Sequence, residues 1–255
     1  MGGLHGGSGF DLPPWLLLPL MMAAAALAGA ALLLLPALLK SRLAVDEVVT
    51  TLLLNFIVLL FVGAMLDGPM KDPTAMGWPQ SVALQDAVQL DKLIPRSRVH
   101  TGLVLALAAA AALWALLRFT IHGFEIRAVG SGARAAAFAG IPVGWVTVKV
   151  ALLSGALAGL AGAVEVAGRA GYVTLDMSPG YGYSGIVIAM LAALHPLGVV
   201  AAAVFVAGIL VGADSMSRVV GVPTYIADVI VAVALLSVLV ATMFTQYRVA
   251  WRQRR

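Results

Sequence analysis

The sequence predicts an all-α membrane protein, a polytopic transmembrane bundle of about seven helices. Of its 255 residues, 62% are hydrophobic and 11% are charged, whereas charged residues make up roughly 25% of an average soluble domain. Apolar runs of about 20 residues recur along the chain, the length that a helix needs to cross a hydrocarbon core of ~30 Å. These runs lack the alternating pattern of a membrane barrel strand. Helices are therefore expected to form the crossings.

Charged residues and turn signals bound the seven expected spans. Only His195 and Pro196 separate the fifth span from the sixth, and proline ends or kinks a helix. This junction is either a tight hairpin or a broken, re-entrant helix, and the choice changes which side of the membrane later segments face. The spans are expected at residues 15–39, 47–66, 101–118, 146–166, 179–194, 196–213 and 224–245.

The distribution of basic residues favours a cytoplasmic C-terminus, because cytoplasmic loops of membrane proteins are enriched in Lys and Arg. With seven crossings, most of the 16 Lys and Arg residues fall on the cytoplasmic side. Residues 1–255 then form a single transmembrane domain. Its parts outside the membrane are an external N-terminal segment at 1–14, an external loop at 67–100, a cytoplasmic loop at 118–145 and a basic cytoplasmic tail at 246–255.

The cytoplasmic loop contains the stretch GFEIRAVGSGARAAAFAGIPVG at 123–144. Its segment ARAAAFAGI predicts a helix of two to three turns, which Pro142 would stop. Small residues would let this helix lie close to another surface, with Phe138 and Ile141 on an apolar face and Arg127 and Arg134 on a polar one. By its residues alone, the loop is either a connector or a docking helix.

This loop resembles the cytoplasmic coupling segment in permease subunits of bacterial ATP-binding cassette importers, in the branched-chain amino acid, ribose and nucleoside branch. Further blocks are similar to the simple-sugar and nucleoside members: DEVVTTLLLNFIV (46–58), LSGALAGLAGAVEVAGRAGYV (153–173) and GYGYSGIVIAMLAALHPLGVVAAAVF (180–205). The similarity covers about residues 40–245. Family members usually have several spans before the first block, and a seven-span chain would start outside, so we expect N-terminal spans to be lacking here.

The resemblance implies a permease subunit of an ATP-driven importer of nucleosides or simple sugars, in the bacterial plasma (inner) membrane. The implied partners are an ATP-binding cassette ATPase subunit, a second permease subunit and an external substrate-binding protein, besides membrane lipid. The ATPase would dock on residues of the cytoplasmic loop. These coupling residues are Arg127, Gly130, Arg134, Ala136, Phe138, Gly140 and Ile141.

No catalytic residue or metal site is predicted in this chain. The sequence lacks the G-x-x-x-x-G-K-[ST] motif, so ATP and Mg²⁺ would be bound by the partner ATPase and no cofactor by this chain. It has no cysteine, no G-x-S-x-G or H-E-x-x-H motif, and four scattered histidines. No arginine-rich tract interleaved with aromatic residues points to nucleic acid.

Polar and aromatic residues near the membrane are candidates for the translocation path. Asn55 lies in the middle of the second span, where polar groups usually face a bundle interior or a cavity. It either bonds to another helix or lines the path. Tyr181 and Tyr183 belong to the glycine-broken segment 168–185, which is either an interfacial aromatic belt or a re-entrant element beside the path.

Glycines at small-xxx-small spacing are candidates for close helix packing, since small residues let membrane helices approach each other. The partner of this packing is either another helix of the same chain or a second permease. The residues are Gly155, Gly159, Gly162, Gly208 and Gly212.

Two other functions stay open on the sequence. An ion-gradient-driven secondary transporter would need a partnered carboxylate within the membrane, and Asp228, about one turn into the last span, is the nearest candidate. A truncated, nonfunctional permease fragment is the second alternative.

Overall fold

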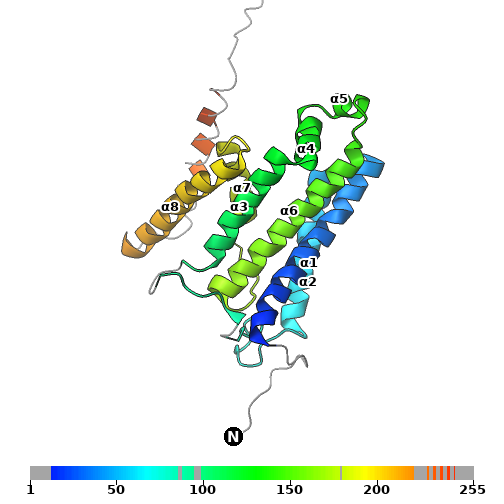
Figure 1. Ribbon diagram of the computed structural model, residues 1–255. Coiled ribbons are helices and arrows are strands. Elements are labelled where there is room, and N and C mark those ends of the chain that lie inside the picture. The colour runs from blue at the N-terminus through cyan, green and yellow to red at the C-terminus, as the bar shows by residue number, and fades with distance from the viewer. Residues whose placement is uncertain are drawn as a thin grey trace, which may run out of the picture. The chain divides into compact units, whose positions relative to one another are not determined.

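The computed structural model describes residues 13–85, 88–94, 99–178 and 180–220, with a few positions between 229 and 244. Helices dominate this part of the chain, and its β-pairing is limited to isolated bridges. Two compact units form. Unit 1 comprises Met1–Leu105 and Thr120–Met177, and unit 2 comprises Ala106–Phe119 and Ser178–Arg255. The helices are labelled in Figure 1.

Unit 1 is built on three long apolar helices. These are α1 (Pro14–Leu43), α2 (Glu47–Asp67) and α6 (Val143–Glu165), and α6 continues into a short π-helical segment, η2 (Val166–Ala170). All three are long and apolar enough to cross a membrane. Helix α1 packs along α6 and also contacts α2. The spans predicted at 15–39, 47–66 and 146–166 are therefore confirmed as helices.

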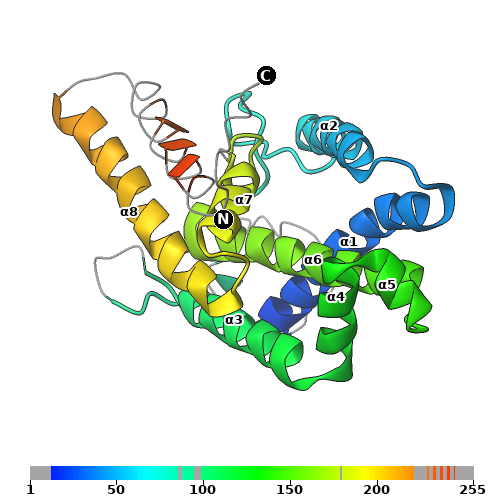
Figure 2. The ribbon, with the colours of Figure 1, turned by 90° about the horizontal axis from the view of Figure 1, so that it is seen from above.

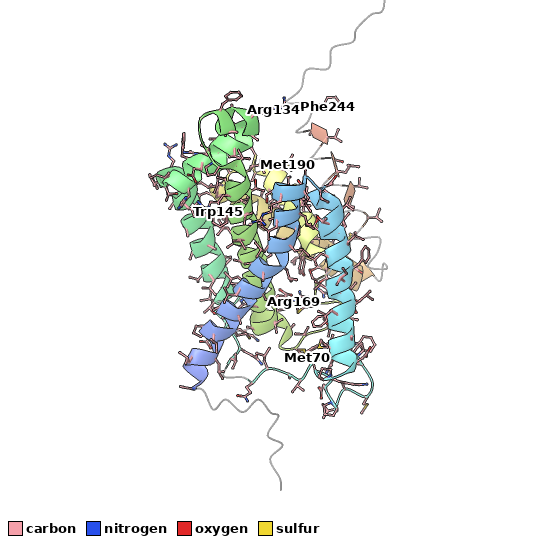
Figure 3. The ribbon with its side chains drawn as sticks, turned by 90° about the vertical axis from the view of Figure 1, so that its right-hand side faces the viewer. Met70, Arg134, Trp145, Arg169, Met190 and Phe244 are labelled. Carbon is pink, nitrogen blue, oxygen red and sulfur yellow. The ribbon has the colours of Figure 1, made fainter. Side chains whose placement is uncertain are left out.

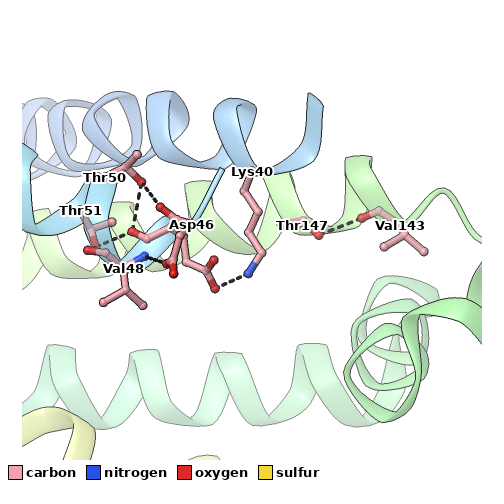
Figure 4. A network of polar contacts seen from close by, with 8 residues as sticks. Lys40, Asp46, Val48, Thr50, Thr51, Val143 and Thr147 are labelled. Atoms are coloured by element: carbon pink, nitrogen blue, oxygen red, sulfur yellow. Dashed lines mark hydrogen bonds and ion pairs between the residues drawn. The ribbon is translucent and has the colours of Figure 1, made fainter. Parts of the chain in front are cut away.

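A tight turn joins α1 to α2. Ala44 adopts the left-handed conformation at the end of α1, and the Asp46 side chain caps α2 by accepting a hydrogen bond from the backbone N–H of Val48 at 2.8 Å. Lys40 forms an ion pair with Glu47 across this turn, and the Thr51 hydroxyl donates to the carbonyl of Glu47 at 2.7 Å (Figure 4). The block DEVVTT thus starts a capped helix, and Asp is among the residues preferred at this position.

The α1–α6 contact is a seam of backbone against backbone. The helices run antiparallel, with Gly29 facing Gly155 and Ala25 facing Gly159. A methyl group added at Gly155 would lie 2.3 Å from the Gly29 carbonyl oxygen, and one added at Gly159 would lie 2.0 Å from that of Ala25. Two of the predicted packing glycines thus lie against α1, a helix of the same chain.

The other three predicted packing glycines have open space beside them. A methyl group added at Gly162, Gly208 or Gly212 would meet no atom within 4 Å in the part of the chain that the structure describes. Gly162 lies on α6 and the other two on α8, so their role in packing stays a prediction.

The long connection after α2 folds back onto the end of α6. Leu90 is buried in a cluster with Met22, Ala163 and Ala167, and its backbone N–H donates to the Ala167 carbonyl at 2.9 Å. Helix α3 (Gly102–Phe119) follows and is also long and apolar enough to cross. The boundary between the units falls within α3.

Unit 2 contains a helical hairpin of α7 (Tyr181–Leu191) and α8 (Pro196–Val220). Val206 is fully buried at its centre, against Val187, Ile188 and Leu191 of α7. Ala193 and Leu194 form the turn with positive φ angles of 48° and 60°. The Leu194 N–H donates to the Ala189 carbonyl at 2.9 Å. The His195-Pro196 junction is therefore a hairpin.

Helix α7 is too short for the full crossing predicted at 179–194. Its 11 residues rise about 16 Å at 1.5 Å each, against a hydrocarbon core of ~30 Å. Five helices of the described residues reach crossing length, and the predicted span 224–245 lies mostly outside those residues. The prediction of an all-α bundle is confirmed, and α7 is shorter than the span expected at 179–194.

Candidate functional site

The predicted coupling loop forms two short helices rather than one. Helix α4 covers Ile121–Ser131 and α5 covers Ala133–Phe138. Thr120 caps α4, because its hydroxyl accepts a hydrogen bond from the Gly123 N–H at 3.0 Å. Both helices contact each other and α6, and Figures 1 and 2 show them beside the first turns of α6.

Helix α5 is shorter than the predicted two to three turns. It ends at Phe138, and Gly140 then turns the chain with a φ of 84°. The Ile141 N–H donates to the Ala136 carbonyl at 3.0 Å, which closes this end of the helix. Glycine is favoured here because residues that carry a side chain rarely adopt a positive φ. Gly140 stops the helix, two residues before the predicted stop at Pro142.

The coupling residues divide into an exposed set and a packed set. The Phe138 side chain is 96% exposed, although it is large and apolar, whereas Ala136 is only 4% exposed. Ile141 is half-buried. Ala136 therefore lies on the packed side of α5, and Phe138 is a large apolar side chain that α5 leaves exposed. The remaining members, Arg127, Gly130, Arg134 and Gly140, are exposed; Arg134 is labelled in Figure 3.

A cluster of three charged or titratable side chains joins α4 to α6. Oε2 of Glu125 lies 3.7 Å from Nζ of Lys149 and 3.4 Å from Nδ1 of His122. Nζ of Lys149 also lies 3.4 Å from the same His122 nitrogen. The Glu125 side chain is only 22% exposed, so the cluster is partly shielded from solvent. These contacts link α4 to α6.

This cluster was not predicted from the sequence. Its local signal was the spacing of His122 and Glu125, which are three residues apart and thus neighbours on a helix. Nothing in the sequence indicates that Lys149, 27 residues after His122, returns to the same place. Such a contact follows from the packing of α4 on α6.

The predicted path residues lie on helix surfaces. Asn55 is exposed in the middle of α2, and Tyr181 and Tyr183 are 43% and 63% exposed in the first turn of α7. Helix α2 belongs to unit 1 and α7 to unit 2, so Asn55 is described only within unit 1, and the two tyrosines only within unit 2. Their role in a translocation path stays a prediction.

The described part of the chain adds no candidate metal site to those considered from the sequence. The described residues contain no group of three His, Asp or Glu side chains suited to a metal ion. Asp228, the carboxylate that a gradient-driven transporter would use, lies outside the residues that the structure describes.

Comparison with known proteins places this arrangement in a family. Residues 3–239 match the family model described as branched-chain amino acid transport system / permease component. The chain is 37% identical to a glucose ABC transporter permease protein of Haloferax volcanii, over 94% of this chain and 65% of the relative. It is 35% identical to a guanosine ABC transporter permease protein of Bacillus subtilis, over 91% of this chain and 67% of the relative.

A third relative, a nucleoside ABC transporter permease protein of Lactococcus lactis, is 28% identical over 87% of this chain and 63% of its own length. The chain thus spans about two thirds of the length of these relatives. No solved structure gives a significant match. With five long apolar helices in the described residues and a family match over most of its length, this multi-pass membrane protein belongs to the branched-chain amino acid transport system permease component family.

Proposed function

We propose that this chain is the permease subunit of an ATP-driven importer for nucleosides or simple sugars. The observation that carries the proposal is the α4–α5 element, a helical projection that is held to α6 and presents Phe138 with 96% of its side chain exposed. An exposed aromatic side chain on a short helix suits insertion into a groove of a partner protein. The relatives named for glucose, guanosine and nucleosides support the substrate class.

In this proposal the ATPase is a separate subunit, which binds ATP and Mg²⁺ and also binds α4 and α5. Movement of the ATPase would act first on the exposed face around Phe138 and Arg134. The Glu125–Lys149 contact, at 3.7 Å, would then pass the movement from α4 to α6. A second permease subunit would complete the translocation path, and an external binding protein would deliver the substrate. This chain changes conformation and performs no covalent chemistry.

The proposal also fixes an orientation. The loop with α4 and α5, the α1–α2 turn and the C-terminal tail would face the cytoplasm of a bacterial cell. In unit 1, the C-terminal end of α1 and the start of α6 lie together, since a methyl group added at Gly144 would lie 3.6 Å from Cβ of Ser41. Lys40 and Arg42 therefore lie at the same end as α4, in agreement with the enrichment of basic residues in cytoplasmic loops.

ATP-dependent uptake tests the proposed function. The chain would be reconstituted in proteoliposomes with its ATPase, its second permease subunit and its binding protein, and the uptake of radiolabelled guanosine and glucose would be measured. We expect uptake that requires ATP on the ATPase side and that ionophores leave intact. Uptake that ionophores abolish, and that continues with a hydrolysis-deficient ATPase, would contradict the proposal and turn attention to an Asp228→Asn variant.

Reversing the charge of Glu125 is expected to uncouple ATP hydrolysis from uptake. The Glu125→Lys variant places a positive charge beside Lys149, so α4 loses its attraction to α6 while α5 keeps its exposed face. Because a partly exposed ion pair contributes about 0.2–1 kcal/mol, the ratio of uptake to ATP hydrolysis should fall by up to about fivefold. The ATPase should still co-purify with this variant.

The double variant Glu125→Lys/Lys149→Glu serves as the matched control. It restores opposite charges at the same two positions, and we expect it to recover most of the lost coupling. If the double variant is as uncoupled as the single one, the ion pair is not what transmits the movement.

A further inference from the structure

Unit 1 contains a cavity of about 430 Å³ at the end opposite α4 and α5. Its volume falls in the range of about 300–1,000 Å³ that is typical of small-ligand sites. Arg169, one of its residues, lies toward the Met70 end of the unit, away from Arg134 (Figure 3). The cavity is lined mainly by aromatic and charged side chains, among them Trp78, Glu165, Arg169, Tyr172 and Asp176, and by Met177.

Hydrogen bonds fix the loop that carries Trp78. The Thr74 hydroxyl and N–H donate to Oδ1 of Asp72 at 2.6 and 2.8 Å, and the Asp72 N–H donates to the Gln80 carbonyl at 3.0 Å. The bond from the Thr74 hydroxyl holds the pKa of the Asp72 carboxyl below its usual value. The turn at 72–80, which carries Trp78, is thus held by hydrogen bonds at its start and between its two ends; Trp78 itself is 62% exposed.

Further hydrogen bonds join this loop to the wall formed by residues 171–174. The Ser81 N–H donates to the Val173 carbonyl at 3.0 Å, and the Val173 N–H donates back to the Ser81 hydroxyl at 2.8 Å. The Leu84 N–H donates to the Gly171 carbonyl at 2.7 Å. Hydrogen bonds within the chain therefore hold the two walls of the cavity together, and such preorganisation lowers the entropic cost of binding a ligand.

The remaining wall is an irregular end of α6. The π-helical segment η2 (Val166–Ala170) is capped by Gly171, whose φ is 72°. Single π-helical turns occur frequently at functional sites. Here the turn follows Glu165 and contains Arg169, whose Nη1 lies 2.5 Å from Oε1 of Glu165. The charges of Glu165 and Arg169 neutralise each other. The carboxylate of Asp176 therefore gives the cavity lining a net negative charge.

We propose that this cavity binds a neutral ring with several hydroxyl groups, such as a monosaccharide or the sugar of a nucleoside. Trp78 and Tyr172 offer aromatic faces to the apolar face of such a ring. The carboxylates of Glu165 and Asp176 accept hydrogen bonds from hydroxyl groups, and Arg169 donates them. The net negative lining disfavours anions. The inference rests on the proposed function, for which the cavity would be an external subsite that receives the substrate before translocation.

Cysteine protection tests this site, because the natural chain has no cysteine. The Met177→Cys variant of the assembled complex would be labelled with a membrane-impermeant maleimide, with and without millimolar guanosine or glucose. We expect one or both ligands to slow the labelling at least tenfold. In the Trp78→Ala and Asp176→Asn backgrounds, this protection should be lost at the same ligand concentrations.

The Met76→Cys variant is the matched control, since Met76 is fully exposed on the same loop and outside the cavity lining. Its labelling should not change with ligand. Equal protection of both cysteines, protection by choline in place of the sugars, or protection that requires the binding protein and not free ligand would each overturn the proposal. ATP-dependent uptake that persists alongside such a result would leave the proposed function intact and reject the external subsite alone.

Discussion

Replacing Gly159 with alanine is expected to lower the melting temperature of the protein by about 2–12 °C. The added methyl group would lie 2.0 Å from the Ala25 carbonyl oxygen and 2.8 Å from its carbonyl carbon, closer than real contacts allow. These are backbone atoms, so no side chain can rotate away and α1 must move off α6. Overpacking typically costs 1–3 kcal/mol, and 1 kcal/mol shifts the melting temperature of a protein of this size by about 2–4 °C.

The matched control is Gly162→Ala on the same helix. It makes the same chemical change three residues later, where the added methyl group would meet no described atom within 4 Å. Alanine in a helix interior is favoured over glycine by about 0.5–1 kcal/mol, so this variant should melt at the same temperature as the natural protein or slightly above it. Thermal unfolding in detergent, followed by tryptophan fluorescence, measures both. Equal melting temperatures for the two variants would mean that the seam is not a close contact.

Replacing Phe138 with glutamate is expected to remove the ATPase partner while leaving the permease folded. The side chain is 96% exposed, so its loss costs the isolated protein little. In an interface, however, a buried aromatic anchor contributes 2 kcal/mol or more, which corresponds to roughly 30-fold in affinity. Co-purification from detergent should therefore recover the ATPase with the natural protein and not with the variant.

Met76→Glu is the control for this experiment. It also replaces a fully exposed apolar side chain with a carboxylate, but on the loop at the opposite end of unit 1, and the ATPase should be retained. Ala136→Glu would be a poor probe, because Ala136 is 4% exposed and its replacement would disturb the packing of α5. If Phe138→Glu retains the ATPase as well as the natural protein does, α5 is only part of a connector.

The long helices could be predicted from the sequence because charged residues mark where their apolar runs begin and end. Asp46 and Asp67 bound the apolar run of α2, so the predicted span 47–66 and the observed helix Glu47–Asp67 differ by one residue. The close packing of Gly155 and Gly159 could also be proposed from spacing alone. The sequence left the partner open, and the structure places α1 against both glycines.

Other features could not be predicted, because they depend on backbone geometry or on distant residues. The end of α7 is formed by Ala193 and Leu194 at positive φ, a conformation that these residue types rarely adopt, so the apolar run overstated the length of the helix. Helix α4 starts at a single Thr cap in a stretch rich in glycine and charge. The cavity brings Trp78 to residues 165–177, and only tertiary packing creates that neighbourhood.

The glycine contact between α1 and α6 has a mechanical consequence. Carbonyl oxygens of α1 fill the space that side chains would occupy at Gly155 and Gly159 of α6, so the two backbones are in close contact there. We expect the two helices to move together. A force applied through α4 to one end of α6 would therefore carry α1 with it, and would reach the loop around Leu90, which packs on both helices, as a tilt of the pair.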